Sequence, residues 1–325
     1  MKRARSISLL MAMVVLLTLS LADTTRGQEK FPSKPIHLIV PMAAGGGTDR
    51  VARALAETLK NHLPQPVLVE NLPGAGSVTG MSKLHTSKPD GYTLGVASGY
   101  VITTALEGIA KFPPTDFTFI ARASADTFTF SVPADSKYKT LKEMIESSKT
   151  EPDKITLGNA GTGALTHLAS VALNQNAGSK FRLVAFVGGA PELTALLGGH
   201  IDSGVFSMSE VLGHSQPGGK IRNLAVFSEK RTPKLPETPT LLELGIKGIP
   251  EGPWQGIVGP KGMPEDIRNI LIEATRKAAN DPYWKGFLEK FGYADRFLPG
   301  QEFEAFFKGD MQMLEALLKS IGKIK

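Results

Sequence analysis

The sequence contains no cysteine among its 325 residues. This absence excludes disulfide bonds, thiolate metal sites, cysteine nucleophiles and a lipid anchor carried on a cysteine. The six histidines show no H-E-x-x-H motif and no other spacing typical of metal ligands; they are at positions 37, 62, 85, 167, 200 and 214. We therefore expect neither a metal site nor a cofactor.

Aromatic residues are few, at 7% of the chain, and the excess of positive charge is small. The formal net charge is +6, but residues 1–27 carry four basic residues and one acidic residue. The remaining 33 basic and 30 acidic residues are scattered along the chain and are not interleaved with aromatic residues. Proteins that bind nucleic acid gather basic residues on one face, so we expect no nucleic-acid partner.

The N-terminus begins with three basic residues in its first five positions, followed by a mainly apolar run from Ser6 to Ala22. This order is typical of a secretory signal peptide, which we place at residues 1–27, with cleavage between Ala22 and Gly27. An uncleaved anchor helix is the alternative, because the run is near the lower length limit for a membrane span. No second run in the sequence is long and apolar enough to span a membrane.

After residue 35, short apolar runs alternate with amphipathic stretches. Ile36–Val40 fits a buried parallel strand. The next segment predicts an amphipathic helix with Thr48 as its N-cap, because apolar residues recur four apart at Val51, Leu55, Leu59 and Leu63. Repeated strand–helix units of this kind imply an α/β fold with parallel strands.

The length of the chain favours two domains. The strand–helix alternation is interrupted at residues 113–122, which we interpret as a bridge between them. Ile221–Phe227 predicts a strand that is able to return to the first domain. Residues 232–239 are rich in proline and predict a connecting segment.

Glycine-rich loops follow two of the predicted strands. Gly45-Gly46-Gly47 leads into the first helix, and the stretch GNAGTGALTHLA at 158–169 leads into another. The start of a helix has unpaired N–H groups and a partial positive charge, and glycine lets an anion approach the backbone closely. Each loop is therefore a candidate anion site, and a pair of such loops, one per domain, strengthens this interpretation. For one loop alone, a tight turn without a ligand fits equally well.

Other uses of glycine loops fit less well. A P-loop ends in Gly-Lys-Ser/Thr, whereas Gly47 is followed by Thr48-Asp49-Arg50. Neither loop matches G-x-G-x-x-G, and the nucleophile motif G-x-S-x-G is absent. His167, one turn into the second helix, either closes its loop by hydrogen bonds or contacts a ligand. Asp202 is either a buried polar hinge or a turn residue.

Several motifs, in this order, resemble the Bug family of periplasmic solute-binding receptors, which serve tripartite tricarboxylate transporters. They are FPSKPIHLIVPMAAGGGTDRVARALAETL, VENLPGAGSVTG, KPDGYTLGVAS, GTGALTHLA, GGAPELTALLGGHID, LPETPTLLELG and WQGIVGP. The resemblance covers nearly the whole chain after Phe31. It implies the type II periplasmic binding protein fold, in which two α/β domains are joined by crossing strands around a ligand cleft. The domains would comprise 28–105 with 229–325, and 106–228.

The resemblance also implies a function. The chain would be an exported, periplasmic binding protein that captures a small organic carboxylate and delivers it to membrane permease subunits, without catalysis and as a monomer. The implied ligand-binding residues belong to the two glycine loops and to neighbouring strand ends. They are Ala44, Gly45, Gly46, Gly47, Thr48, Asp49, Ser98, Asn159, Gly161, Thr162, Gly163, Ala164, His167, Gly188, Pro191 and Asp202. Among these, Asp49 is expected to order its loop, because its charge would repel an anion.

The chain departs from the family at two places. The second loop of the family often carries serines where this chain has Asn159 and Ala164, so that Thr162 is the remaining hydroxyl. Met42-Ala43-Ala44 replaces a position that is often aromatic or flanked by proline. Both changes favour a bulkier or less charged acid than a dicarboxylate.

Two other functional classes remain open. An α/β enzyme would use the same anion sites, with Asp49, His167 and Asp202 as the candidate acids and bases. A receptor that reports to a signalling system would have the same binding site and no role in transport.

Overall fold

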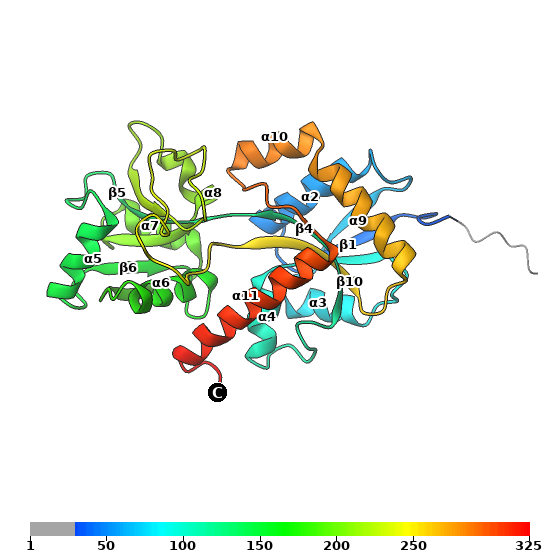
Figure 1. The fold of residues 1–325 in the computed structure, drawn as a ribbon, viewed down its shortest axis with the longest axis horizontal. Coiled ribbons are helices and arrows are strands. Elements are labelled where there is room, and N and C mark those ends of the chain that lie inside the picture. The colour runs from blue at the N-terminus through cyan, green and yellow to red at the C-terminus, as the bar shows by residue number, and fades with distance from the viewer. Residues whose placement is uncertain (1–29) are drawn as a thin grey trace, which may run out of the picture.

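The computed structural model describes residues 30–325, and this part of the chain forms two lobes, each built on one β-sheet (Figure 1). We call them the first and the second lobe. The strand order is β11-β4-β10-β3-β1-β2 in the first lobe and β7-β6-β8-β5-β9 in the second. The expected signal peptide at 1–27 lies outside the described residues. No helix within 30–325 is long and apolar enough to cross a membrane.

In the first lobe, β1, β2 and β3 are parallel, and β10 runs antiparallel to β3 and β4. Its strands are β1 (Ile36–Val40), β2 (Val67–Asn71), β3 (Thr93–Ala97), β4 (Phe117–Ala125), β10 (Trp254–Pro260) and β11 (Leu298–Pro299). Its helices are α2 (Gly47–Leu59), α3 (Val78–His85), α4 (Gly99–Leu106), α9 (Glu265–Ala279), α10 (Pro282–Phe291) and α11 (Gly300–Ser320), with a 3₁₀ turn at Ala75–Ser77.

In the second lobe, β6, β7 and β8 are parallel, and β5 runs antiparallel to β8 and β9. Its strands are β5 (Phe128–Pro133), β6 (Thr156–Asn159), β7 (Arg182–Ala185), β8 (Ser203–Ser207) and β9 (Ile221–Val226). Its helices are α5 (Leu141–Thr150), α6 (Leu165–Asn176), α7 (Gly189–Leu197) and α8 (Met208–Val211), with a 3₁₀ turn at Leu212–His214.

The chain passes between the sheets twice, from β4 to β5 and from β9 to β10 (Figure 1). These crossings confirm the predicted two-domain binding fold. The detailed assignments differ. Within residues 113–122, which the sequence analysis interprets as a bridge, 117–122 belong to strand β4 of the first sheet, and the crossing follows the end of this strand. Strand β9 pairs with β5 in the second sheet. The domain bounds expected from the sequence, 28–105 with 229–325 and 106–228, remain a prediction.

The helices of the first lobe cover both faces of its sheet. The predicted stripe of α2 is buried, with Val51 and Leu55 each 1% exposed, and packs together with α9 and α10 on one face. On the other face lie α3, α4 and α11 (Figure 1). The α11 side chains Phe303 and Phe307 pack edge-on against Phe119 of β4, with ring centroids 5.3 and 4.9 Å apart. Further along α11, Leu314 lies in the same apolar cluster as Leu168 of α6, so this helix joins the two lobes.

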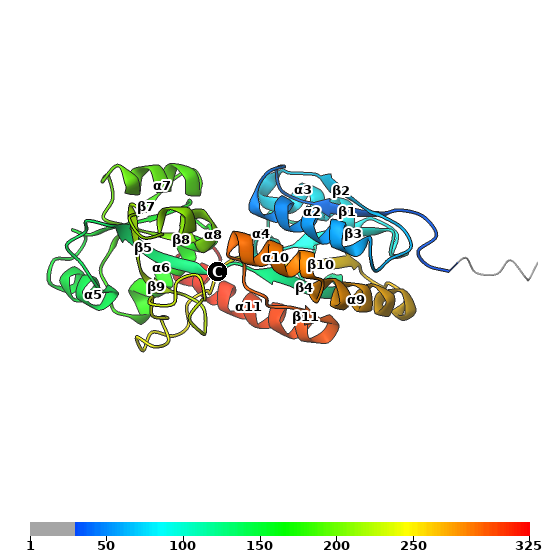
Figure 2. The same cartoon turned by 90° about the horizontal axis from the view of Figure 1, so that it is seen from above.

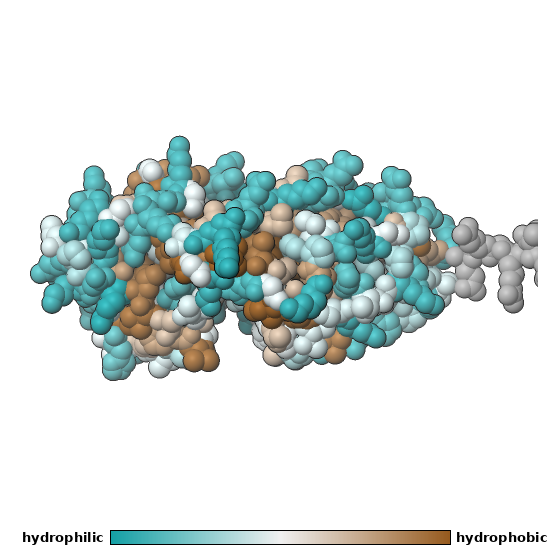
Figure 3. Space-filling view, turned by 90° about the horizontal axis from the view of Figure 1, so that it is seen from below, coloured by the Kyte–Doolittle hydropathy of each residue, from teal (hydrophilic) through white to brown (hydrophobic). Residues whose placement is uncertain are grey.

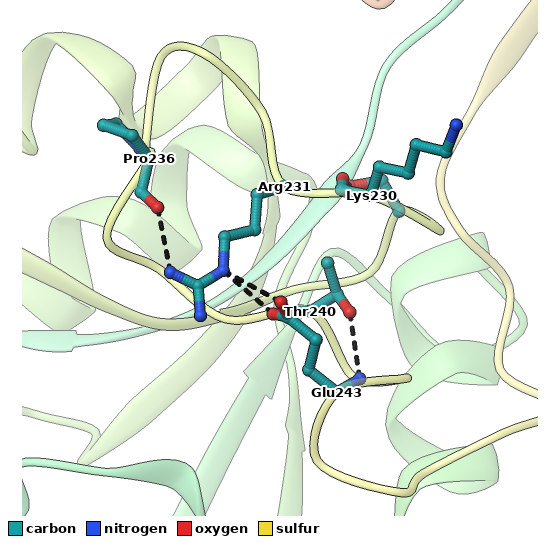
Figure 4. Close-up of polar contacts among 6 residues, drawn as sticks. Lys230, Arg231, Pro236, Thr240 and Glu243 are labelled. Atoms are coloured by element: carbon teal, nitrogen blue, oxygen red, sulfur yellow. Dashed lines mark hydrogen bonds and ion pairs between the residues drawn. The ribbon is translucent and has the colours of Figure 1, made fainter.

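The long connection between β9 and β10 is held by its own polar contacts (Figure 4). Arg231 donates through Nε to both carboxylate oxygens of Glu243, at 3.1 and 3.0 Å, and through Nη1 to the carbonyl of Pro236 at 3.1 Å. The backbone N–H of Glu243 donates to Oγ1 of Thr240 at 3.0 Å. These contacts hold the connection in shape, and the N–H of Val226 in β9 donates to the carbonyl of Pro239 at 2.9 Å, which joins the connection to the second sheet.

Candidate functional site

The first glycine loop, which we define as Pro41–Gly46, joins the end of β1 to the start of α2. The helix begins at Gly47 with Gly46 as its N-cap, so the expectation that Thr48 is the N-cap is wrong. Gly45 has a φ of +84°, a left-handed conformation that glycine adopts without strain. Within residues 30–325, no acceptor faces the backbone N–H groups of Gly46, Gly47 and Thr48. These amides are free to bind an anion.

Asp49 holds the first glycine loop in place through hydrogen bonds, as a capping hydroxyl group would. It is 3% exposed, and its carboxylate accepts from the N–H of Gly45 at 2.8 Å, from Nε of Arg53 at 3.0 Å and from Nδ2 of Asn71 at 2.9 Å. Burial raises the pKa of Asp49, but these donors outweigh it and the pKa is lowered overall. Because both oxygens are already bonded, Asp49 holds the loop in shape.

The second glycine loop, Ala160–Ala164, joins β6 to α6 and is closed mostly on itself. The N–H of Gly161 donates to Oδ1 of Asn159 at 3.1 Å, and the N–H of Gly163 donates to Nδ1 of His167 at 3.2 Å. The N–H of Ala164 donates to the carbonyl of Gly161 at 3.0 Å. His167 therefore has the loop-closing position, and burial together with the charge of Lys323 lowers its pKa.

Two donors of the second loop remain open. The side chain of Asn159 is fully buried, and its Nδ2 atom has no hydrogen-bond partner among the described residues. Thr162, at the tip of the loop, is exposed, and its N–H has no acceptor within 30–325. Buried donors are normally bonded, so the Nδ2 group of Asn159 is well suited to a ligand or to an ordered water.

The two lobes meet beside these loops. Ser98 directly follows β3, is buried and is the N-cap of α4. A Cβ on the next residue, Gly99, would lie 3.1 Å from Cδ1 of Leu165 at the start of α6. The carboxyl ends of β3 and β6 therefore face each other. Figure 3 shows the surface hollowed between the lobes, with apolar residues within the notch.

The start of α7 lies at the same edge of the second sheet. Gly188 is its N-cap, with a φ of +102°, and Pro191 is exposed in its first turn. Asp202 lies at the other end: its carboxylate accepts from the N–H and Oγ1 of Thr156, at 2.8 and 2.7 Å, before β6 and β8 begin. The four residues of β6 separate it from the glycine loops by about 10 Å. Asp202 is thus not brought together with the other predicted residues.

Beneath α7, a carboxyl group is enclosed by the sheet. Gly158 and Gly204 are paired in register on β6 and β8, and a Cβ on either would lie 3.2 or 2.8 Å from Oε1 of Glu192. Glu192 is fully buried, and its two oxygens have no hydrogen-bond partner of good geometry within 30–325. The backbone N–H of Val205 lies near enough to lower the pKa of this carboxyl, against the larger effect of burial. Burial and the charge of Glu210 raise its pKa to about 9. At neutral pH this carboxyl is protonated.

Polar residues that the sequence did not reveal lie beside the starts of α2 and α7. Arg50 follows Asp49 on α2, and its guanidinium lies 5.4 Å from the ring centroid of Phe291. Tyr293, after α10, points its hydroxyl at the carbonyl of Gly47, 3.5 Å away. Glu210 belongs to α8 of the second lobe. The spacing Ser207-x-x-Glu210 after a strand is a capping-box pattern that marks a helix start, whereas Tyr293 is remote in sequence and carries no such signal.

A concavity lies beside Tyr293, whose hydroxyl points at the carbonyl of Gly47. It has a volume of about 670 Å³ and is lined by the connection after β9, from Ser228 to Lys234, and by the end of α10 and the residues that follow it. Its lining mixes basic and acidic side chains. Among residues 30–325, no group of three or more histidine, aspartate or glutamate side chains is placed to hold a metal ion.

Comparison with known proteins gives consistent matches over most of the chain. The family model described as "Tripartite tricarboxylate transporter family receptor" matches residues 51–323. A Cupriavidus necator protein named "UPF0065 protein in gbd 5'region" is 34% identical over 298 residues, which is 91% of this chain and 90% of that protein. BugT of Bordetella pertussis is 31% identical over 249 residues, 75% of this chain and 76% of BugT.

Solved structures agree with the sequence comparisons. A TctC solute-binding protein from Polaromonas, without ligand, superimposes with a TM-score of 0.81 at 35% identity, covering 89% of this chain and 99% of that one. MatC from Rhodopseudomonas palustris, with bound malate, has a TM-score of 0.71 at 25% identity, covering 89% and 100%.

Proposed function

Because the chain belongs to the family of tripartite tricarboxylate transporter receptors, we propose that it is an exported binding protein that captures a small organic carboxylate between its two lobes. It would hand this ligand to the permease subunits of a transporter of the same type. The family consists of solute-binding receptors, and we propose that this member likewise catalyses no reaction. The N-terminal segment at 1–27 would direct it to the periplasm, where it would act as a monomer.

The observation that carries this proposal is the set of unpaired donors at the facing strand ends. The first lobe offers the amides of Gly46, Gly47 and Thr48, and the second offers Nδ2 of Asn159 and the N–H of Thr162. A carboxylate has about four lone-pair sites and suits such a set of donors. The related MatC, with its bound malate, supports an acid as the ligand class.

Ligand binding would be coupled to closure of the lobes. A carboxylate that bonds to both loops at once favours the closed arrangement, because the open one can supply only one side of the contacts. We propose that the closed form is the one a permease recognises. A receptor that reports to a signalling system would use the same closure. Genes for permease subunits beside the gene of this protein would favour transport over signalling.

The test is differential scanning fluorimetry of the purified protein, refolded to remove bound ligand, with a panel of mono-, di- and tricarboxylates, aromatic acids and amino acids. A ligand at a hundredfold excess over its Kd adds about 2.7 kcal/mol of stability and raises the melting temperature. A folded protein that shifts with none of these acids would contradict carboxylate binding and reopen the enzyme interpretation.

Gly46→Val is the informative variant. Gly46 has a φ of −73°, and an added Cβ would meet only the carbonyl of Ala43, at 3.5 Å, so the substitution fits the fold. Its side chain would block the approach of an anion to the neighbouring amides, and the thermal shift should be lost. Gly286→Val, on α10 with no atom within 4 Å of the added Cβ, is the matched control and should keep the shift.

A further inference from the structure

The amino-terminal ends of β1, β2 and β3 form an uncovered strip of the first sheet. His37, Leu68 and Thr93 lie side by side on these strands, because His37 is in register with both of the others. His37 is exposed, although β1 has a strand on either side, and Leu68 is 44% exposed. The side chains of three neighbouring strands are thus open to solvent on one face.

Helix α3 covers the rest of this face and ends before it reaches the strip. Gly95 lies two residues after Thr93 and so on the same face, and a Cβ there would lie 2.6 Å from Cδ2 of Leu84 in α3. The helix ends one residue later, at His85. Beyond it, the strip is the floor of a concavity of about 510 Å³. This concavity lies where residues 30–35 enter β1, at the end of the first lobe that faces away from the second lobe (Figure 1).

The lining of this concavity, which we call the lysine groove, is positively charged. It includes Lys34 before β1, Lys83 in the last turn of α3 and Lys88 after that helix. All three lysines are exposed, and none forms an ion pair within residues 30–325. Asp90 is the one acidic residue of the lining, and its Oδ1 already accepts from the N–H of Tyr92 at 3.1 Å. The groove is therefore complementary in charge to an acidic partner.

Strand β2, which carries Leu68 at one side of the groove, forms an edge of the first sheet. It pairs with β1 and has no strand on its other side among the described residues. The N–H of Ile36 donates to the carbonyl of Pro66 at 3.0 Å. Even-numbered residues of β2 therefore bond to β1, and the backbone groups of Val67 and Val69 point outwards. The free backbone groups of an edge strand are able to pair with an extended chain of another protein.

We infer that the lysine groove is a docking surface for an extended, acidic segment of a partner protein. The carboxylates of the segment would lie against Lys34, Lys83 and Lys88. Its backbone would pair along the free edge of β2, beside Leu68. A lipid bilayer suits this surface less well, because a bilayer is flat and offers no backbone to pair. The groove lies at the opposite end of β1 from the first glycine loop, so the inference goes beyond the proposed function and does not depend on which acid is bound.

The test measures the binding of a fluorescein-labelled octapeptide of alternating glutamate and threonine, whose carboxylates all lie on one face when the chain is extended. Fluorescence anisotropy is recorded at pH 7.5 in 25 mM and in 150 mM NaCl. The groove variant reverses the charge of the three lining lysines: Lys34→Glu, Lys83→Glu and Lys88→Glu. The control variant makes the same change of charge at three exposed lysines of the second lobe: Lys142→Glu, Lys154→Glu and Lys180→Glu. Melting temperatures establish that both variants fold.

We expect the wild type and the control variant to bind the peptide alike in 25 mM NaCl. The groove variant should bind it at least about tenfold more weakly, because three attractions become repulsions. Raising the NaCl concentration to 150 mM should weaken binding to the wild type, since exposed charges are screened. A peptide of alternating lysine and threonine should not bind.

Four results would overturn the inference. The first is that the peptide binds neither protein, or binds both triple variants equally. The second is that glutarate displaces the peptide at the same concentration of carboxylate groups, which indicates a site for a small anion. The third is that the groove variant loses affinity for phosphatidylglycerol vesicles and not for the peptide, which indicates a membrane surface. The fourth is a dimer of the wild type in analytical ultracentrifugation that is absent from the groove variant, which indicates a second copy of the chain as the occupant. All four leave carboxylate capture intact, because that proposal is tested by the acid panel.

Discussion

Glu192→Gln should change how the stability of this protein depends on pH. The carboxyl of Glu192 is enclosed between α7 and the paired glycines of β6 and β8, and burial holds its pKa at about 9, against 4.5 in the unfolded chain. Between these values the folded protein keeps a proton that the unfolded chain releases. Since the folded pKa is the higher one, the stabilisation is complete below about pH 4.5 and is lost as the pH rises towards 9.

The magnitude follows from one proton. The free energy of unfolding should fall by about 1.4 kcal/mol per pH unit from this group alone, which is about 4 kcal/mol between pH 5 and pH 8. Glutamine has nearly the same shape and no proton to lose, so Glu192→Gln removes that slope. The variant should match the wild type at pH 5 and exceed its stability at pH 8.

Urea unfolding followed by circular dichroism at each half pH unit from 5 to 8.5 measures the difference. Glu70→Gln, at an exposed position of β2, serves as the control and should run parallel to the wild type. If the stabilities of wild type and Glu192→Gln differ by the same amount at every pH, then Glu192 does not retain a proton on folding. The reasoning from its burial would then be refuted.

Three further changes test the packing and the loops, each by urea unfolding. Gly204→Ala should lower the free energy of unfolding by about 1–3 kcal/mol, because its methyl group would lie 2.4 Å from a ring carbon of the buried Phe206. The control Gly286→Ala should be neutral or stabilise α10 by up to about 1 kcal/mol. Asp49→Ala should cost about 3 kcal/mol at pH 7 through the lost loop hydrogen bonds. The pKa of Asp49 is lower in the folded protein than its ordinary value of 3.8. The stability difference between Asp49→Ala and the wild type should therefore shrink only when the pH falls below 3.8. Trp254→Phe should cost about 1–3 kcal/mol, since it leaves the half-buried carboxylate of Asp310 without its 2.8 Å donor. An unchanged urea midpoint in any of these variants would contradict the contact from which its cost was derived.

Local patterns predicted much of the fold correctly. The strand–helix alternation, the apolar stripe of α2 and the position of both glycine loops depend on neighbouring residues only, and all are present. The resemblance to tripartite transporter receptors is confirmed by the family match. Helix α4 was missed, because its sequence GYVITTAL is apolar and β-branched on all sides and shows no helical period. Helix α10 was also missed, although Asp281-Pro282 is a usable start signal.

The sequence did not predict contacts between residues that are distant along the chain. The sequence left open whether Ile221–Phe227 returns to the first domain, because strand pairing is set by the whole sheet; in the structure β9 pairs with β5 of the second sheet. The position of Asp202 could have been predicted from the sequence. Asp202 precedes β8, whereas the glycine loops follow β1 and β6, so Asp202 belongs at the opposite edge of the sheet. The ligand contacts of the remaining predicted residues stay a prediction.

The course of α11 also determines how the molecule unfolds. This helix lies along one side of both lobes, while the notch opens on the side away from it (Figure 2). Its apolar side chains belong to a cluster that includes residues of both sheets, so the two lobes share this part of their cores, although each lobe also has a separate cluster of its own. Melting of one lobe would expose the side chains that the other packs against. The two lobes should therefore unfold together in one cooperative transition, and a bound ligand should raise the melting temperature of the whole protein.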